Sequence, residues 1–191
     1  MTAEELQALR TRLEETLPDG AILEVQESGA LVLRPDALLE AGRLLRDEEG
    51  FDYLSNVSGV DWLDQNEFEV VYHLYALRRG ERMLSTGQPD GAPLATGPSP
   101  ENQLSVAASA EAKRVSAEGM LGPVVLKVRV PRDNPVVPSV AGLWSSALFQ
   151  EREAYDMFGL QFEGHPNLKR IYLWDEFADH PLRKDYVPEE A

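Results

Sequence analysis

The 191-residue sequence contains no cysteine. This absence excludes disulfide bonds, cysteine-ligated zinc, cysteine-ligated iron–sulfur clusters and thiolate nucleophiles, and it is compatible with a reducing compartment. Apolar runs are also short, and none approaches the roughly 20 residues that a membrane-spanning helix needs. The N-terminal stretch MTAEELQALRTRLEETL lacks the apolar centre of a signal peptide. We therefore expect other proteins to hold this chain at any membrane where it works.

Positive charge is scarce. Lysine and arginine number 18 against 33 aspartates and glutamates, which gives a net charge of −15 and an isoelectric point near 4.6. Such a chain repels the phosphates of nucleic acids and the head groups of anionic lipids. Neither class of partner is predicted.

The first third of the chain predicts two helices around a hairpin. A helix is expected over residues 2–17, where leucines recur at helical spacing after a capping box formed by Thr2 and Glu5. Alternating apolar segments flank Ser28-Gly29 and predict a β-hairpin over residues 21–35. A second helix is expected over residues 36–50.

The middle of the chain predicts a sheet that a long insertion interrupts. YLSNVSGVDWL and FEVVYHLYAL are typical of strands, and PVVLKVRVP continues the sheet with Lys127 and Arg129 on one face. Between these strands, residues 85–121 read as an insertion, because four prolines and three glycines fall within its first sixteen residues.

These elements together predict an α+β fold with a mixed, largely antiparallel sheet, helices packed on one face, and an extended C-terminal tail. We expect residues 1–159 to form the α+β domain, with the Pro/Gly/Ala-rich insertion at 85–121. Residues 160–191 are expected to form the tail.

The last predicted helix contains the stretch EREAYDMFG. Ser139 can cap a helix that runs toward Phe158, with a break in its middle left open, and Gly159 fits the left-handed position that ends many helices. If that helix is continuous, Glu151 lies inside its apolar stripe.

Three charged residues of this helix admit several interpretations. Arg152 precedes Asp156 by four residues, a spacing that favours a side-chain pair. Glu151, Arg152 and Asp156 are ordinary surface charges in one interpretation. In the second they pair with groups from the tail or from another subunit, and in the third they form an acid/base dyad.

Two His-Pro pairs follow, at residues 165–166 and 180–181. Proline holds the preceding residue in an extended backbone, and we expect each histidine to donate to a backbone carbonyl. A metal site that combines these histidines with Glu151 and Asp156 is the alternative, but no HxH, HxxxH or HExxH spacing supports it. His73 is expected to be an ordinary residue of the sheet.

The motifs EREAYDMFG, FEGHPNLKRI and HPLRKDY resemble the signature of a known family. Together with GVDWL, FEVVYHL and PSVAGLWSSALFQ, in the same order, they are similar to the 30 kDa subunit of respiratory complex I, the proton-pumping NADH–quinone oxidoreductase. The resemblance covers residues 51–186 apart from the insertion. The chain departs from the pattern in its longer insertion, in Asp179 where glycine is common, and in Val187 where proline often stands.

This resemblance implies a structural subunit of the peripheral arm of an NADH:quinone oxidoreductase, a translocase of the bacterial cell inner membrane. It implies no catalytic, cofactor-binding or metal-binding residue in this chain, because the flavin and the iron–sulfur clusters are expected in other subunits. The expected partners are the 49 kDa-type large subunit and the cluster-bearing subunit beside it, at the cytoplasmic face of the membrane. The alternatives are the equivalent subunit of a membrane-bound hydrogenase-type complex and a stand-alone acid/base or metal enzyme.

We expect the charged helix and the tail to lock together and to contact partner subunits. The tail lies far past the last core helix, so we expect it to find little of its own domain to bury against. The residues expected at this structural interface are Glu151, Arg152, Tyr155, Asp156, Phe158, Gly159, His165, Pro166, Arg170, His180, Pro181, Leu182, Arg183, Lys184, Asp185 and Tyr186.

Overall fold

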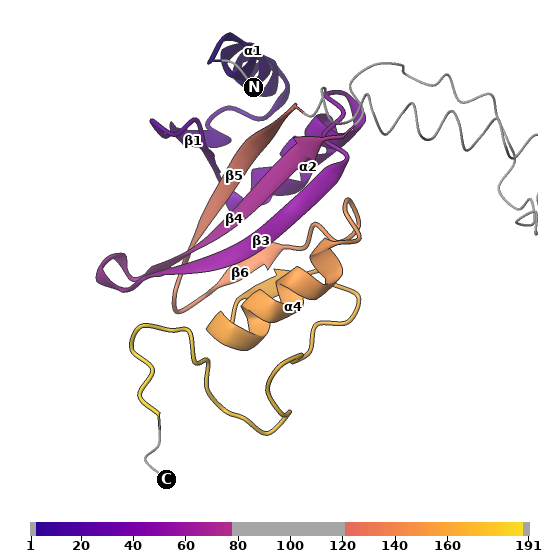
Figure 1. The fold of residues 1–191 in the computed structure, drawn as a ribbon. Helices are drawn as coiled ribbons and strands as arrows, with labels where there is room; N and C mark the ends of the chain where they lie inside the picture. Colours follow the sequence, from indigo (N-terminus) through magenta and orange to yellow (C-terminus); the bar gives the residue numbers. More distant parts are fainter. Residues whose placement is uncertain (1–2, 78–120, 189–191) are drawn as a thin grey trace, which may run out of the picture.

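Figure 1 shows the fold in a computed structural model, which describes residues 3–77 and 121–188. These ranges contain helices, a large sheet and a small second sheet, followed by the tail, which has little regular structure. In chain order the elements are α1 (Ala3–Thr16), β1 (Ile22–Val25), β2 (Leu31–Leu33), η1 (Pro35–Ala37), α2 (Leu38–Asp47), β3 (Tyr53–Trp62), η2 (Leu63–Gln65), β4 (Glu67–Ala76), β5 (Leu121–Pro131), β6 (Val136–Pro138), α4 (Ala147–Phe158) and β7 (Gln161–Glu163).

The large sheet has five strands in the order β1-β2-β5-β4-β3. The pairs β1/β2, β3/β4 and β4/β5 are antiparallel, and β2/β5 is the one parallel pair among them. The predicted hairpin is therefore confirmed as β1 and β2, with Gly29 at a φ of 83° in its turn. The predicted α+β fold with a mixed, largely antiparallel sheet is also confirmed.

The strand period of two separates the two faces of the sheet. On β4, one set of side chains is at most 1% exposed and belongs to the core: Phe68, Val70, Tyr72 and Leu74. Leucines of α1 and α2 join the same cluster, and Figure 1 shows α2 behind the sheet. Each such leucine stabilises the fold by roughly 1.5–3 kcal/mol relative to an exposed one.

The opposite face carries a buried carboxylate between two cations. Glu69 of β4 is 1% exposed, and it lies 3.1 Å from the Lys127 ammonium and 3.0 Å from Nε of Arg129. The predicted placement of Lys127 and Arg129 on one face is confirmed, as is the placement of His73 within a strand. The two cations compensate this carboxylate, which would be costly to bury at this depth without a partner.

The segment before α4 differs from the prediction. The helix begins at Ala147, so its predicted start at Ser139 is wrong. Residues 140–147 form hydrogen-bonded turns, in which the Val140 carbonyl accepts the amides of Leu143 and Trp144 at 2.9 and 3.0 Å. The parallel pair β6/β7 was not predicted either, because strands of three residues beside prolines have no readable period.

Some predictions fall outside the described residues. The capping box depends on Thr2, which lies outside the described residues. The predicted insertion also lies outside them, except for Leu121, which begins β5. Within the described ranges, none of the helices has the length and apolar character that crossing a bilayer requires.

Candidate functional site

The candidate site is the joint between α4 and the C-terminal tail, residues 160–188 of which are described. α4 ends at Gly159, as predicted, with a φ of 76° and an amide that donates to the Tyr155 carbonyl at 2.8 Å. A Cβ on Gly159 would lie 2.5 Å from Nη2 of Arg183 and 2.6 Å from Nε2 of His180. Glycine is required here both by the backbone conformation and by the close approach of the tail.

Asp156 is the centre of this joint. Its side chain is fully buried, and Oδ2 accepts the backbone amides of Ile171, Tyr172 and Leu173 at 3.0, 2.7 and 3.0 Å. Oδ1 accepts Nη1 of Arg170 at 2.6 Å. Burial alone would raise the pKa of Asp156, but the three amides and Arg170 lower that pKa to about 2. The carboxylate therefore stays charged and orders the tail around itself.

Cationic and imidazole groups of the tail bind the free carbonyls at the C-terminal end of α4. Arg170 and Nδ1 of His180 donate to the Asp156 carbonyl at 3.2 and 2.9 Å, and Nε of Arg183 donates to the Phe158 carbonyl at 2.7 Å. The last carbonyls of a helix lack partners within it and carry partial negative charge. The tail satisfies them, which makes it the cap of α4.

Arg152 and His165 bind the first part of the tail to α4. Arg152 donates to the carbonyls of Lys169 and Arg170, each at 3.0 Å. The predicted side-chain pair of Arg152 with Asp156 is therefore wrong, because the tail engages both groups. His165 donates from Nε2 to the Leu148 carbonyl at 3.0 Å. The prediction that each His-Pro histidine donates to a backbone carbonyl is confirmed.

The end of the tail is fixed to the sheet. The Lys184 amide donates to Oδ2 of Asp61 at 2.8 Å, and Asp61 is a buried residue of β3. Arg132 lies 3.5 Å from Asp61 and 2.7 Å from Asp185, and so it links the sheet to the tail. The expectation that the tail has little of its own domain to bury against is therefore wrong.

Three aromatic rings complete the packing of the joint. The guanidinium groups of Arg132 and Arg183 each lie 5.1 Å from the centre of the Phe68 ring, which also meets the edge of the Phe158 ring. The imidazole of His180 packs edge-on against the Tyr155 ring at 6.5 Å.

Sequence reasoning missed Asp61 and Arg132. The available signal was an acidic residue in the core-facing register of a strand, since Asp61 pairs with Phe68 across β3 and β4. No such signal marks Arg132, which follows β5 in a turn that sequence alone reads as solvent-exposed.

Glu151 lies in a different environment from the other charges of α4. It is fully buried inside the domain, where it accepts the Ser139 hydroxyl at 2.5 Å and the Val140 amide at 2.7 Å. The expected pairing of Glu151 with the tail or another subunit is thus wrong. Burial raises its pKa to about 7 against the opposing effect of Ser139 and Val140. Burial also raises the pKa of Tyr72, and the charge of Glu151 raises that pKa further.

The remaining predicted residues occupy peripheral positions in the joint. The Leu182 amide donates to the Met157 carbonyl at 3.1 Å, while its side chain is 55% exposed. The Tyr186 amide donates to the Arg183 carbonyl at 3.1 Å. Pro166 is exposed and Pro181 is half-buried.

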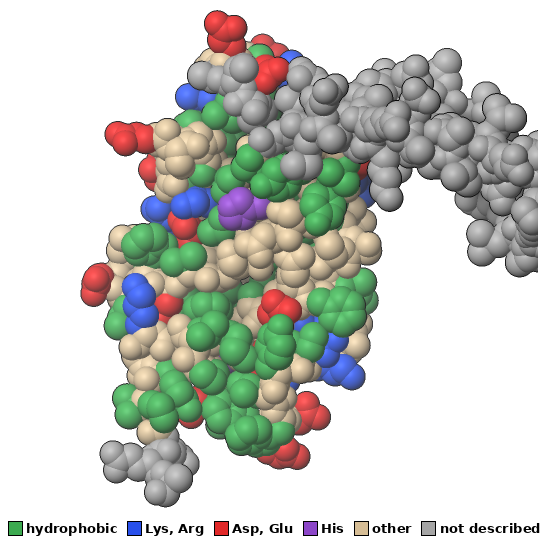
Figure 2. Space-filling model, viewed as in Figure 1, with side chains coloured by type: hydrophobic (Ala, Val, Ile, Leu, Met, Phe, Trp, Pro, Cys, Tyr) green, Lys and Arg blue, Asp and Glu red, His purple; other side chains and the backbone are tan. Residues whose placement is uncertain are grey.

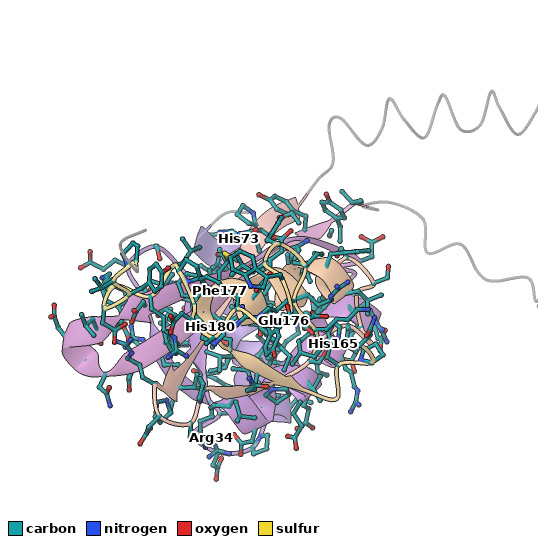
Figure 3. The ribbon with its side chains drawn as sticks, turned by 90° about the horizontal axis from the view of Figure 1, so that it is seen from below. Arg34, His73, His165, Glu176, Phe177 and His180 are labelled. Carbon is teal, nitrogen blue, oxygen red and sulfur yellow. The ribbon has the colours of Figure 1, made fainter. Side chains whose placement is uncertain are left out.

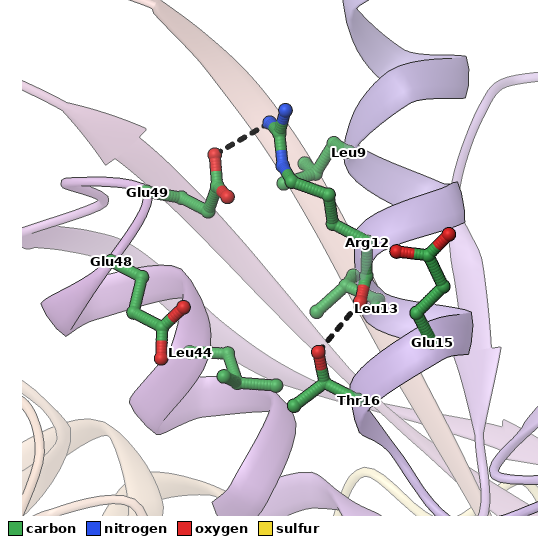
Figure 4. A pocket seen from close by; sticks show the side chains of 8 residues that line it. All are labelled: Leu9, Arg12, Leu13, Glu15, Thr16, Leu44, Glu48 and Glu49. Carbon is green, nitrogen blue, oxygen red and sulfur yellow. Dashed lines mark hydrogen bonds and ion pairs between the residues drawn. The ribbon is translucent and has the colours of Figure 1, made fainter.

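The described residues do not assemble a metal centre at the joint. No group of three or more His, Cys, Asp or Glu side chains among them could hold a metal ion, and each His-Pro imidazole is bonded to a carbonyl of its own. A cavity of about 220 Å³ lies elsewhere, between α1 and the end of α2, and Figure 4 shows the side chains that line it. Its lining residues are Leu9, Arg12, Leu13, Glu15, Thr16, Leu44, Glu48 and Glu49.

The residues matched in comparisons with known proteins include strands of the large sheet and the whole joint. The family model described as "Respiratory-chain NADH dehydrogenase, 30 Kd subunit" matches residues 31–191. The subunit designated C in the NADH-quinone oxidoreductase of Moorella thermoacetica is 34% identical over 91% of this chain and 90% of its own length. The subunit of the same designation from a Roseiflexus species is 35% identical over 91% of this chain and 79% of its own.

The fold has also been seen in a solved structure. A chain of the membrane-bound sulfane sulfur reductase, an archaeal respiratory membrane complex, aligns with a TM-score of 0.63 at 18% identity, over 96% of this chain and 86% of that one. At that identity the likeness concerns the fold alone.

Proposed function

Because the chain belongs to the family of the 30 kDa subunit of respiratory-chain NADH dehydrogenase, we propose that it is a non-catalytic structural subunit of the peripheral arm of NADH–quinone oxidoreductase. In this role it supports electron transfer from NADH to quinone coupled to proton translocation. The observation that carries the proposal is the pair of NADH-quinone oxidoreductase relatives at 34% and 35% identity, each spanning 91% of this chain.

The chemistry of the joint supports a structural role. Asp156, Arg170 and His180 bind one another or the end of α4, and Glu151 is sealed inside the domain. A general acid or base must reach a substrate through a pocket. The joint uses its charges to hold the tail in one conformation, which suits a subunit that presents a shaped surface to others.

The cofactors and partners of the proposal follow from the family. The chain binds no cofactor, and the flavin and iron–sulfur clusters belong to other subunits. Its neighbours are the 49 kDa-type large subunit and the cluster-bearing subunit beside it. The chain lies at the cytoplasmic face of the bacterial cell membrane and associates with the membrane only through this complex.

Deletion of the chain from its native organism tests the proposal. We expect membranes from the deletion strain to lose the assembled complex on native gels and to lose NADH:quinone reductase activity, and a plasmid copy should restore both. Mass spectrometry of the complex captured through a tagged chain identifies its partners. A complex that oxidises a donor other than NADH would support the hydrogenase-type alternative, and turnover by the isolated chain would support a stand-alone enzyme.

A further inference from the structure

The two sides of the tail differ in chemistry. Its inner side holds Arg170, His180 and Arg183, whose hydrogen bonds to α4 are described above. Its outer side carries Tyr172 and Trp174, which are 64% and 63% exposed. Figure 2 shows hydrophobic side chains gathered on the lower part of the molecule, over the tail, with acidic side chains beside them. Large apolar side chains that gather on an exposed surface mark interaction sites.

The exposed tryptophan is held in a preformed turn. The Phe177 amide donates to the Trp174 carbonyl at 3.1 Å, and the two rings meet nearly edge-to-face with centroids 4.8 Å apart. Arg170 lies over the other ring of this pair, 5.7 Å from the Phe177 centre, and donates to the Asp179 carbonyl at 3.1 Å. Figure 3 shows Glu176, Phe177 and His180 grouped on the tail. Because Arg170 is itself fixed to Asp156, the turn is rigid before any partner binds.

Tyr172 is held by similar means. Its backbone amide donates to Asp156 at 2.7 Å, and its hydroxyl donates to Oε1 of Glu153 at 2.7 Å. The ring is therefore exposed but fixed in orientation. A fixed aromatic side chain loses little conformational entropy on binding, which favours affinity.

The charged side chains within the segment that carries these rings are all acidic. The segment IYLWDEFAD, residues 171–179, contains Asp175, Glu176 and Asp179 but no lysine or arginine. All three acidic side chains are exposed. A partner that buries the rings would place its rim against these carboxylates, so a basic rim would be complementary and an acidic one repelled.

We propose that Tyr172 and Trp174 are the anchors by which this chain docks into an apolar groove, edged by lysine or arginine, on another subunit of the same complex. The proposal rests on the proposed function and deepens it. It assigns partner contact to the outer aromatic side chains. The motif residues Arg170, His180 and Arg183 are positioning residues, since they hold the tail to its own domain. Trp and Tyr are, with Arg, the residues enriched among interface hot spots, and here Arg170 and Arg183 are engaged within the chain.

Competition between two tagged copies of the chain tests the anchors. A wild-type copy and a variant copy, each with its own tag, are expressed together in the deletion strain. The ratio of the two copies is then measured in the assembled complex and in the unassembled pool. We expect Trp174→Ala to be at least tenfold under-represented in the complex and Tyr172→Ala at least fivefold, because hot-spot truncations have effects of this order. Leu23→Ala is the matched control, since Leu23 is a 59% exposed side chain on β1, and it should compete equally.

Two further measurements test whether the variants fold normally and whether the acidic residues contribute to docking. The purified Trp174→Ala chain should melt within about 2 °C of wild type, since truncation of an exposed side chain changes stability little. The double variant Asp175→Lys/Glu176→Lys should also compete poorly, and raised salt should narrow its deficit. The proposal would be overturned if the Trp174→Ala and Tyr172→Ala copies each entered the complex as often as the wild-type copy.

The outcome for the wild-type copy distinguishes a failure of the proposed function from a failure of the anchor assignment. If wild-type chain enters no complex with NADH:quinone reductase activity, the proposed function fails and the anchors are not at fault. If wild-type chain enters that complex and the Trp174→Ala copy enters it equally well, the function stands and the anchor assignment fails.

Discussion

Asp156 is the single residue on which most of the tail depends. It satisfies three consecutive amides and Arg170 at once, so its removal takes the carboxylate away from one buried cation and leaves three backbone donors without this partner. Glu151, five positions earlier in the same helix, is equally buried but binds only groups of its own domain. Two carboxylates in one helix therefore have pKa values displaced in opposite directions. Burial raises both, but in Glu151 burial prevails over two donors, whereas in Asp156 three amides and Arg170 overcome it.

The first prediction concerns Asp156→Asn. At pH 7 we expect it to lower the free energy of unfolding by about 3 kcal/mol, the cost of breaking a buried pair, and to speed exchange of the amides of residues 171–173. The folded-state pKa of about 2 lies below the ordinary 3.8, so this stabilisation is present above pH 4 and is lost as the pH falls toward 2. Urea unfolding at pH 7 and pH 3 measures the loss of unfolding free energy and its pH dependence, with exposed Asp175→Asn as the control. Hydrogen exchange measures the amides. A loss at pH 3 as large as that at pH 7 would contradict this account.

The second prediction concerns Glu151→Gln. The folded-state pKa of about 7 lies above the ordinary 4.5, so the folded chain keeps a proton that the unfolded chain releases between these values. Wild-type stability should therefore fall by about 3 kcal/mol as the pH rises from 4.5 to beyond 7. The glutamine of Glu151→Gln cannot titrate. The stability of this variant should therefore change less than that of wild type between pH 4.5 and pH 7. Unfolding by urea at pH 5 and pH 8 checks this, with exposed Glu27→Gln as the control that should follow wild type.

At the scale of elements, α4 and the tail form one unit. α4 supplies carbonyls that lack helical partners, and the tail supplies the arginines and the histidine that satisfy them. Gly159 is the point where they meet. The unit is joined to the sheet through Asp61 and Arg132.

The third prediction compares two glycines in this unit. Gly159 and Gly164 both have positive φ, at 76° and 83°, but only Gly159 has tail atoms within 4 Å of an added Cβ. Gly164→Ala should cost the roughly 1–2 kcal/mol of a left-handed alanine. Gly159→Ala should cost a further 1–3 kcal/mol or so, because His180 and Arg183 must move. Thermal unfolding gives the two values, and proteolysis of the tail should be faster in Gly159→Ala. Equal costs at both positions would show that the tail does not press on Gly159.

At the scale of the whole molecule, the described residues form a five-stranded sheet followed by α4 and the tail. The tail is anchored to its own domain by its inner side and, in our proposal, to a partner by its outer side. The insertion leaves the sheet between β4 and β5, strands that pair directly in antiparallel register. Closing a loop between two paired strands costs entropy that grows only slowly with loop length.

The fourth prediction follows from that topology. Replacement of residues 85–120 by a short Gly/Ser turn should leave the domain folded, with a melting temperature within about 5 °C of wild type. Leu121 is retained because it pairs with Ala76 at the start of β5. Circular dichroism melts of the full chain and the shortened chain make the comparison. Loss of cooperative unfolding in the shortened chain would place the replaced residues in the core.

The sequence by itself determined the features that depend on local spacing. The alternation of β4 and β5, the hairpin at Gly29 and the end of α4 at Gly159 could all be read from residue order, because strands, turns and helix caps have short-range rules. The family motifs were also readable. His165 and His180 were assigned to backbone carbonyls on the strength of the prolines that follow them.

Only the tertiary structure decided which charges meet. Glu151, Arg152 and Asp156 are neighbours in one helix, yet they bind the segment before the helix, the carbonyls of Lys169 and Arg170, and the amides of residues 171–173 respectively. Asp61 and Lys184 are brought together from distant parts of the chain. Helical periodicity predicts which side of α4 a residue occupies but not what covers that side. The partner of a buried charge is set by the path of the whole chain, because any group that reaches it in the folded state can compensate it.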